Sequence, residues 1–291
     1  MKIEDLALSF VPKLTHMAAA HLIDTFGSAE SIFAATKEEL IHNAELRADI
    51  AQSIVAKAGF AAAERELELC NKAGITIVAA TDSSYPNGLK FLPDRPHIIY
   101  MVGELSLINC SSLCALTGER DNVSSYGEKT TVKLLEQISE HAPETVIVGA
   151  LEGGVDSIAL RSGHHFGLRS IGVTSAPLTQ IAPQSAAHLA DEILESGGVV
   201  LSEVGVMSGA ADDSLAPHHR IIAGLCSGIV VVEGSKIPQI ASYADSYGRE
   251  LMAIPGRVTD NMSWGANAMI ASSMAQMVCT GEDIVKQLFW D

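Results

Sequence analysis

The sequence has few basic residues for its length. Nineteen lysines and arginines stand against 35 aspartates and glutamates in 291 residues, which gives a formal net charge of −16 with histidine neutral. Proteins that bind polyanions without sequence preference usually carry an excess of positive charge. This balance argues against strong non-specific binding to nucleic acid, although it leaves room for a local basic cleft.

Long hydrophobic runs are also missing. No apolar stretch approaches the ~20 residues that span a bilayer. The N-terminus, MKIEDLALSF, carries acids at Glu4 and Asp5 and no extended apolar region. We therefore expect no signal peptide, no membrane span and a cytoplasmic location.

Cysteine is sparse and irregularly spaced. The five cysteines are Cys70, Cys110, Cys114, Cys226 and Cys279. An odd number without regular spacing predicts reduced thiols rather than a disulfide framework. Cys110 and Cys114 have no second pair of ligands nearby in the sequence, so we expect no zinc site and no other metal.

Aromatic residues make up only 5% of the chain, while hydrophobic residues make up 47% and charged residues 19%. This composition is typical of a globular protein and not of a disordered one. Small and β-branched side chains dominate, as in proteins whose helices pack closely on a sheet. The length suggests one large domain, or one large and one small domain.

Residues 1–72 are predicted to form a small helical module of the SAM or helix-hairpin-helix-like kind. In HLIDTFGSAESIFAATKEEL, Gly27 ends one helix, Ser28 begins the next, and Thr36 with Glu39 forms a capping box for a third. A DNA-binding hairpin would need basic residues that this segment lacks. A structural helical bundle is therefore favoured over a DNA-binding module.

Residues 73–291 are predicted to form an extended Rossmann-like domain. Continuous apolar strands such as SLCALTG, ETVIVGA, RSIGVTS and GIVVVEG alternate with helical segments. Continuous rather than alternating apolarity means burial on both faces, and alternation with helices means mostly parallel strands. The fold class is therefore α/β, with a doubly wound, mostly parallel sheet. In such sheets ligands bind beyond the carboxyl ends of the strands.

Two segments after strands are candidate anion sites. In TGERDNVSSYG, Arg120 could bind a phosphate through two donors or form an ion pair with a neighbouring acid. Ser124 or Ser125 could cap the helix that follows, whose N-terminus offers free N–H groups. In GALEGGVD, Gly153 and Gly154 permit close backbone approach, so anion binding and a plain tight turn both stay open.

The segment PHHRIIAGLC raises the possibility of metal binding or catalysis. His218 and His219 are adjacent, and neighbouring helical residues point about 100° apart, so they do not suit one metal ion. No serine lies in a G-x-S-x-G motif, and no nucleophile, base and acid can be assembled. We therefore assign no catalytic residue. In PGRVTDN, Gly256 is expected to allow another close backbone approach, or a simple turn.

Several segments, in this order, resemble the DNA-processing protein A (Smf) family. The similar segments are ITIVAATDSSYPNGLKFLPDRPHIIYMVG, LTGERDNVSSYG, GGVDSIAL, RIIAGLCSGIVVVEG, YGRELMAIPG and GANAMI. The resemblance implies an extended Rossmann-type domain that binds single-stranded DNA and delivers it to the RecA recombinase in natural transformation. It also implies a homodimer, no cofactor and no catalysis. We expect no C-terminal winged-helix module, which many members carry.

The resemblance implies a set of DNA- and phosphate-binding residues. Arg120 and the helix start would hold a backbone phosphate, Gly153 and Gly154 would line the same pocket, and Arg220 would keep the last basic residue of the family's Arg-Asn-Arg segment. The full expected set is Arg120, Ser125, Tyr126, Gly127, Gly153, Gly154, His218, His219, Arg220 and Gly256.

This chain departs from the family pattern in ways that keep two other functions open. His218 and His219 stand where the family has Arg and Asn, and Glu152 lies inside the glycine turn, where it would repel a phosphate. One alternative is a protein-interaction relative that has lost tight DNA binding. The other is a nucleotide-cleaving enzyme of the phosphoribohydrolase type, although PGRVTDN lacks the PGGxGTxxE motif of those enzymes.

Overall fold

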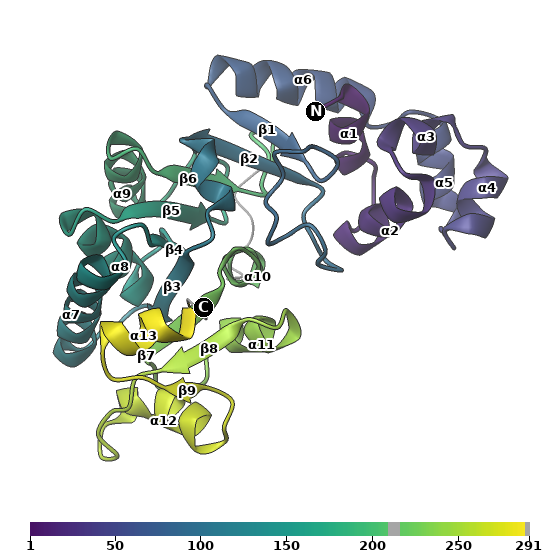
Figure 1. Cartoon of the computed structure of the whole chain (residues 1–291). Coiled ribbons are helices and arrows are strands. Elements are labelled where there is room, and N and C mark those ends of the chain that lie inside the picture. Colours follow the sequence, from purple (N-terminus) through teal and green to yellow (C-terminus); the bar gives the residue numbers. More distant parts are fainter. Residues whose placement is uncertain (209–215, 289–291) are drawn as a thin grey trace.

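The structure, a computed structural model, describes residues 1–208 and 216–288 (Figure 1). A nine-stranded sheet runs through it in the order β1-β2-β6-β5-β4-β3-β7-β8-β9. The pairs β1–β2 and β2–β6 are antiparallel, and the other six pairs are parallel. The prediction of a mostly parallel, doubly wound α/β sheet is confirmed.

The strands are β1 Thr76–Ala79, β2 Ile98–Gly103, β3 Leu113–Gly118, β4 Val146–Ala150, β5 Arg169–Thr174, β6 Val199–Ser202, β7 Gly228–Glu233, β8 Glu250–Ala253 and β9 Gln276–Met277. The helices that connect and flank them are α7 Ser125–His141, α8 Gly154–His165, α9 Gln184–Glu195, α10 Ala216–Leu225, α11 Gln239–Ser246, α12 Trp264–Ala271 and α13 Gly281–Leu288. Short 3₁₀ turns lie at Leu105–Asn109 and Asn261–Ser263.

Helices cover both faces of the sheet (Figure 1). β7 is buried along its whole length. Its residues Ile229 and Val231 join the core beneath α10 and α11, while Val230 and Val232 join the core beneath α7 and α13. Since side chains alternate across a strand, burial on both faces requires a continuous apolar run, which is the pattern seen in the sequence.

The strand order reverses beside β3. From β3 the chain moves outward through β4, β5 and β6, and it then returns to place β7 on the other side of β3. The connections on the two sides therefore leave in opposite directions and open a crevice at the carboxyl ends of the strands. Any ligand of this sheet is expected in that crevice.

Six helices precede the sheet: α1 Ile3–Ser9, α2 His16–Phe26, α3 Ala29–Ala34, α4 Lys37–Asn43, α5 Ala48–Val55 and α6 Phe60–Lys72. The predicted helix ends are confirmed. Gly27 is left-handed at φ 81°, Ser28 accepts from the N–H of Ser31, and Thr36 forms a capping box with Glu39. The division into two domains stays a prediction.

The helices of residues 1–72 contact the loop between β1 and β2. A ring nitrogen of His97 lies 2.8 Å from the carbonyl oxygen of Asp5, and Arg95 donates to the Asp24 carboxylate at 2.5 Å. Within the described part of the chain, no helix is both long enough and apolar enough to cross a membrane.

Candidate functional site

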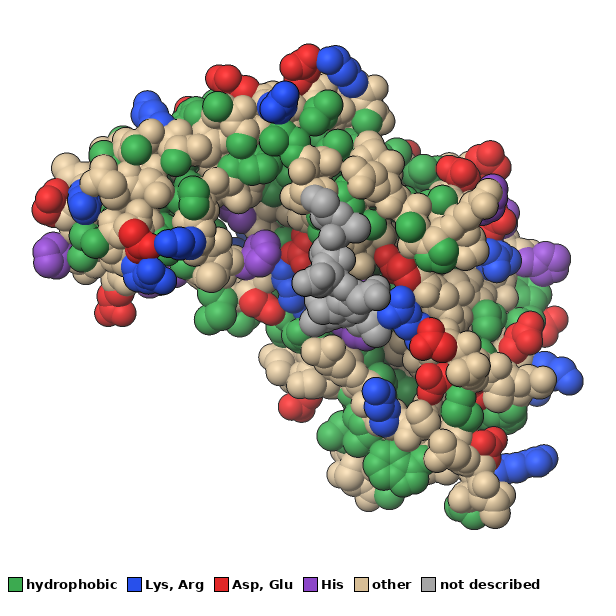
Figure 2. Space-filling model, turned by 180° about the vertical axis from the view of Figure 1, so that it is seen from behind, with side chains coloured by type: hydrophobic (Ala, Val, Ile, Leu, Met, Phe, Trp, Pro, Cys, Tyr) green, Lys and Arg blue, Asp and Glu red, His purple; other side chains and the backbone are tan. Residues whose placement is uncertain are grey.

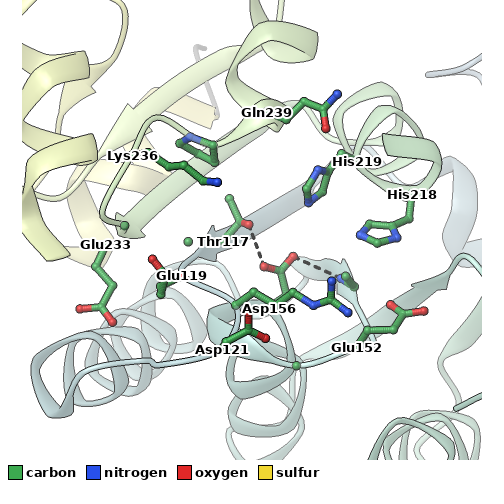
Figure 3. Close-up of a pocket in the computed structure, with 16 residues that line it drawn as sticks. Thr117, Glu119, Asp121, Glu152, Asp156, His218, His219, Glu233, Lys236 and Gln239 are labelled. Atoms are coloured by element: carbon green, nitrogen blue, oxygen red, sulfur yellow. Dashed lines mark hydrogen bonds between the residues drawn. The ribbon is translucent and has the colours of Figure 1, made fainter. Parts of the chain in front are cut away.

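A cavity of about 280 Å³ lies in the crevice where the strand order reverses (Figure 3). It is formed by the ends of β3, β4 and β7 and the starts of α8, α10 and α11. Its lining residues are Thr117, Gly118, Glu119, Arg120, Asp121, Ala150, Glu152, Gly153, Asp156, His218, His219, Glu233, Gly234, Lys236, Pro238 and Gln239. Segments that the sequence predicts to follow separate strands thus form a single site.

Asp156 forms the floor of the cavity. Its Oδ1 accepts from the N–H of Ala150 at 3.2 Å, and its Oδ2 accepts from the Thr117 hydroxyl at 2.7 Å. Burial raises the pKa of Asp156 to about 6, because desolvation penalises the charged form more than these two hydrogen bonds favour it. Asp156 therefore links the ends of β3 and β4 to the first turn of α8.

Glu152 lines the cavity, and only one of its two carboxylate oxygens accepts hydrogen bonds from described residues. Its Oε1 accepts from the Thr174 hydroxyl at 2.6 Å and from the N–H of Ser175 at 3.2 Å. Its Oε2 is buried and has no hydrogen-bond partner among the described residues. The glycine turn therefore carries a fixed carboxylate with one unused acceptor.

His218 and His219 enter the cavity from the first turn of α10. Their ring centroids are 4.8 Å apart with planes at 84°, an edge-to-face contact. Burial is the main cause that lowers the pKa of each to about 4, and the charge of Arg120 contributes to both values in the same direction, as His218 does for His219. Both imidazoles are therefore neutral at pH 7, and the described residues contain no cluster of three metal-ligand side chains.

Within the described part of the chain, no carboxylate pairs with the two cations of the cavity, Arg120 and Lys236. Neither forms an ion pair or a side-chain hydrogen bond with another described residue. Lys236 extends its ammonium group over the cavity from the loop after β7 (Figure 3). The ion pair with Glu119 or Asp121 that the sequence left open for Arg120 does not form.

The start of α7 is occupied by a carboxylate of the protein itself. Glu233, at the end of β7, accepts from the backbone N–H of Ser124 at 2.7 Å and from its hydroxyl. The Ser124 hydroxyl in turn accepts from the N–H of Gly127. A Cβ on Gly127 would lie 2.3 Å from the Glu233 carboxyl carbon. Ser124, not Ser125, caps the helix, and Glu233 lies where we expected a phosphate.

The two glycines of the turn after β4 have different surroundings. Both have positive φ, 102° at Gly153 and 73° at Gly154. A Cβ on Gly154 would lie 2.4 Å from the carbonyl oxygen of Glu119, whereas one on Gly153 would meet nothing nearer than 3.7 Å. Gly154 is therefore required by the contact between two loops, and Gly153 lines the open side.

Tyr126 and Gly256 lie in a neighbouring hollow with Arg257. The Tyr126 hydroxyl donates to the carbonyl oxygen of Pro255 at 3.0 Å, and the side chain is 45% exposed. The expected close approach at Gly256 is present, since a Cβ there would lie 2.0 Å from the Ser263 hydroxyl.

Exposed hydrophobic side chains gather at the end of the molecule that holds α12 (Figure 2). Val258 is 95% exposed and Trp264 is 56% exposed, and both line a shallow hollow next to the one that Tyr126 borders.

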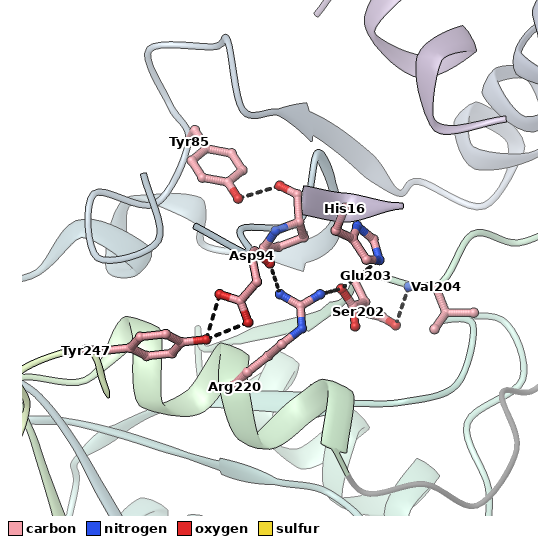
Figure 4. Close-up of polar contacts among 9 residues, drawn as sticks. His16, Tyr85, Asp94, Ser202, Glu203, Val204, Arg220 and Tyr247 are labelled. Atoms are coloured by element: carbon pink, nitrogen blue, oxygen red, sulfur yellow. Dashed lines mark hydrogen bonds and ion pairs between the residues drawn. The ribbon is translucent and has the colours of Figure 1, made fainter. Parts of the chain in front are cut away.

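Arg220 does not share the cavity with Arg120. Its guanidinium donates to the carbonyl oxygen of Asp94 at 2.6 Å and to the carboxylate of Glu203, and the side chain is buried (Figure 4). Two positions along a helix correspond to about 200° of rotation, so Arg220 faces away when His218 faces the cavity. The geometry therefore does not support the expected single pocket of Arg120, Gly153, Gly154 and Arg220.

Three features of the site were not predicted from the sequence: the ammonium group of Lys236, the buried carboxyl group of Asp156 and the contact of Glu233 with the start of α7. The signal for Lys236 was available, because it follows the strand GIVVVEG at the ligand-binding edge. The role of Glu233 had no local signal, because its partner lies 109 residues away in the sequence.

A doubly wound sheet with a polar cavity at its point of strand reversal defines an extended Rossmann-like α/β protein. The family model for DNA recombination-mediator protein A matches residues 76–289. The chain belongs to this family. It is 28% identical to the DNA processing protein DprA of Bacillus subtilis over 227 residues, which is 77% of this chain and 75% of that protein. It is 31% identical to DprA of Streptococcus pneumoniae over 211 residues, 71% of this chain and 72% of that protein.

Solved structures show the same fold. The X-ray structure of DprA from Streptococcus pneumoniae matches with a TM-score of 0.83 at 23% identity, covering 100% of this chain and 99% of that chain. A DprA structure from Helicobacter pylori, described for its single-stranded DNA binding mode, matches with a TM-score of 0.63 at 22% identity. It covers 74% of this chain and 95% of that one.

Proposed function

We propose that this chain is a non-catalytic, cytoplasmic protein that binds single-stranded DNA at the carboxyl edge of its sheet and assists the loading of RecA in DNA uptake and recombination. Family membership supports this proposal. The observation that carries it is the distribution of charge at the edge, where Arg120 and Lys236 form no ion pair with any described residue and most carboxylates accept hydrogen bonds from the chain.

Four carboxylates of the cavity accept hydrogen bonds from the chain. Glu119 accepts from Ser235, Glu152 from Thr174 and Ser175, Asp156 from Thr117 and Ala150, and Glu233 from Ser124. These N–H and O–H donors partly offset the negative charge of the four carboxylates. These acids are held in place by the fold and form no ion pair with Arg120 or Lys236, although Oε2 of Glu152 keeps no partner among the described residues.

Arg120, Lys236 and Arg257 would contact the DNA backbone. Among the described residues none of the three forms an ion pair; Arg120 and Lys236 line the cavity, and Arg257 lines the hollow that contains Tyr126. Arginine and lysine at such positions bind phosphates without reading sequence. The partly exposed ring of Tyr126 could stack on a base, an interaction worth ~1–3 kcal/mol.

Arg220 would act by positioning the cavity. Its contacts with Glu203 and Asp94 fix the first turn of α10, which carries His218 and His219. Of the remaining members of the expected set, four would contribute backbone surface: Ser125, Gly153, Gly154 and Gly256. Gly127 would not, because it is buried against the Glu233 carboxylate. We also propose a homodimer, as the family resemblance implies.

The test is an equilibrium titration of a labelled single-stranded oligonucleotide, followed by fluorescence anisotropy at 50 and 200 mM salt. The proposal predicts binding that weakens with salt, with a slope of about −0.7 per phosphate contacted. Addition of RecA should then show faster filament nucleation on the strand. RecA association without DNA binding would favour the protein-interaction alternative.

Cleavage of a nucleotide is a second candidate function, because a carboxyl group with a pKa of about 6 lines the cavity. Such a group could exchange protons at neutral pH. Both oxygens of Asp156 are engaged by Thr117 and Ala150, however, which suits a structural role. Release of free base from nucleoside monophosphates, followed by chromatography, would establish this activity.

A further inference from the structure

The cavity contains three buried polar atoms that no described residue satisfies. They are Oε2 of Glu152, Nδ1 of His218 and Nδ1 of His219. His218 is only 2% exposed. Buried polar groups are nearly always hydrogen-bonded, so three unsatisfied atoms around one cavity point to a ligand. Glu152 and the two imidazoles lie on the same side of the cavity (Figure 3).

These atoms favour a ligand that donates hydrogen bonds. A carboxylate oxygen can only accept, and a neutral imidazole nitrogen can accept when its proton is on the other nitrogen. The low pKa values of both histidines keep them neutral at pH 7. At this position a phosphate would be repelled by the Glu152 carboxylate. Beside Arg120 and Lys236 it would be attracted by two positive charges.

Glu152 is fixed in orientation, which makes its free oxygen a specific acceptor. Oε1 is held by the Thr174 hydroxyl and the Ser175 N–H, so Oε2 is the atom left for the cavity. The cavity volume of about 280 Å³ matches a single small ligand rather than a stretch of chain.

We propose that this cavity is a subsite for one unstacked nucleobase, and that it prefers bases with an exocyclic amino group over thymine. Because these atoms are buried from solvent, the side chains would rotate slightly for the amino group to donate one hydrogen to Oε2 of Glu152 and the other to an imidazole Nδ1. Thymine has a single N–H between two carbonyl oxygens, and those oxygens would face the carboxylate. Arg120 and Lys236 would hold the attached phosphate.

This inference rests on the proposed function for the claim that the base belongs to DNA. The hydrogen-bonding argument for a base with an amino group does not depend on that function. The base could belong to a DNA strand whose phosphates follow the edge, or to a free mononucleotide.

The test uses 12-nucleotide strands of abasic sites with one central base: cytosine, adenine or thymine. Because all strands have the same phosphates, any difference in affinity reports the base alone. The proposal predicts that cytosine and adenine bind about tenfold more tightly than thymine, which corresponds to ~1.4 kcal/mol. The mononucleotides dCMP, dAMP and dTMP are titrated in parallel by calorimetry.

Glu152→Gln provides a sharper test. Its amide oxygen would keep the bonds from Thr174 and Ser175, so its NH₂ group would face the cavity as a donor. The preference should then shift toward thymine. Glu144→Gln, an exposed position before β4, is the control for the change in charge and should keep the preference of the unmodified protein.

Equal affinity of the unmodified protein for all three bases would overturn the inference, whether or not Glu152→Gln folds. Binding of strands without base preference would leave the proposed DNA binding intact and refute only the base subsite. Selective binding of dCMP and dAMP without strand binding would support the subsite and refute the DNA function. No binding of any strand or mononucleotide would refute both.

Discussion

Arg220 and Glu203 form a buried ion pair that joins α10 to the end of β6 (Figure 4). The Arg220 and Glu203 side chains are 10% and 8% exposed. Burial raises the pKa of Glu203 even though the charge of Arg220 acts in the opposite direction. Tyr247 donates to Asp94, whose carbonyl oxygen accepts from Arg220, so the pair belongs to a wider network.

Removal of Arg220 should therefore reduce stability. Arg220→Ala would leave the Glu203 carboxylate buried without its cation, which costs about 3–5 kcal/mol. Urea unfolding followed by circular dichroism would measure this loss. Arg161→Ala is the control, because Arg161 pairs with Glu192 on the exposed surface and should cost less than about 1 kcal/mol. Unchanged stability of Arg220→Ala with weaker DNA binding would instead make Arg220 a direct DNA contact.

The turn after β4 offers a matched pair of substitutions. Gly153→Ala and Gly154→Ala both place a side chain at positive φ, which costs roughly 1–2 kcal/mol. Gly154→Ala adds a clash with the loop at Glu119 and should cost ~1–3 kcal/mol more. Gly153 lies at φ 102° and ψ −174°, a region where essentially only glycine is found, so its backbone cost is at least that of Gly154 and the difference between the two unfolding free energies is a lower limit for the cost of the clash. A smaller loss for Gly154→Ala than for Gly153→Ala would mean that the two loops can separate without cost.

The two cavity histidines should make the protein sensitive to acid. Their pKa values are lowered to about 4 in the folded state from 6.5, so between pH 6.5 and 4 the unfolded chain binds more protons at these positions. Their contribution to stability is therefore lost as the pH falls through this window. Asp156, whose pKa is raised from 3.8 to about 6, acts in the opposite direction.

Two histidines outweigh one aspartate, so the net effect of these groups is a loss of stability on acidification. The double variant His218→Gln/His219→Gln removes the histidine contribution. The melting temperature of the unmodified protein should fall more than that of this variant between pH 6.5 and 4.5. Parallel pH profiles would show that neither imidazole is held neutral by burial.

The fold could be predicted from the sequence because its signals are local. Continuous apolar strands, the glycine turn at Gly153 and Gly154, and the capping residues Ser28 and Thr36 each depend on neighbouring residues. The carboxyl ends of parallel strands meet at one edge, which predicted that Arg120 and the turn at Gly153 lie together; His218 and His219 were grouped with them only through the family resemblance.

The parts that could not be predicted depend on contacts between distant segments. Glu233 fills the start of α7 through Ser124, a partner 109 residues away. Arg220 faces Glu203 and not the cavity because the rotation of α10 is set by its packing on the sheet. The sequence reveals which residues follow each strand, but not which side of α10 each residue occupies.

The most direct test of the central claim is DNA binding by the double variant Arg120→Ala/Lys236→Ala. Arg65→Ala/Lys72→Ala, two exposed positions on α6, provides the same change in charge far from the cavity. Titration of a labelled strand over a range of salt concentrations measures both variants. The account predicts that only the first loses affinity, with a salt slope smaller by about 1.4 for two phosphate contacts. Equal affinities and equal slopes for the two variants would contradict it.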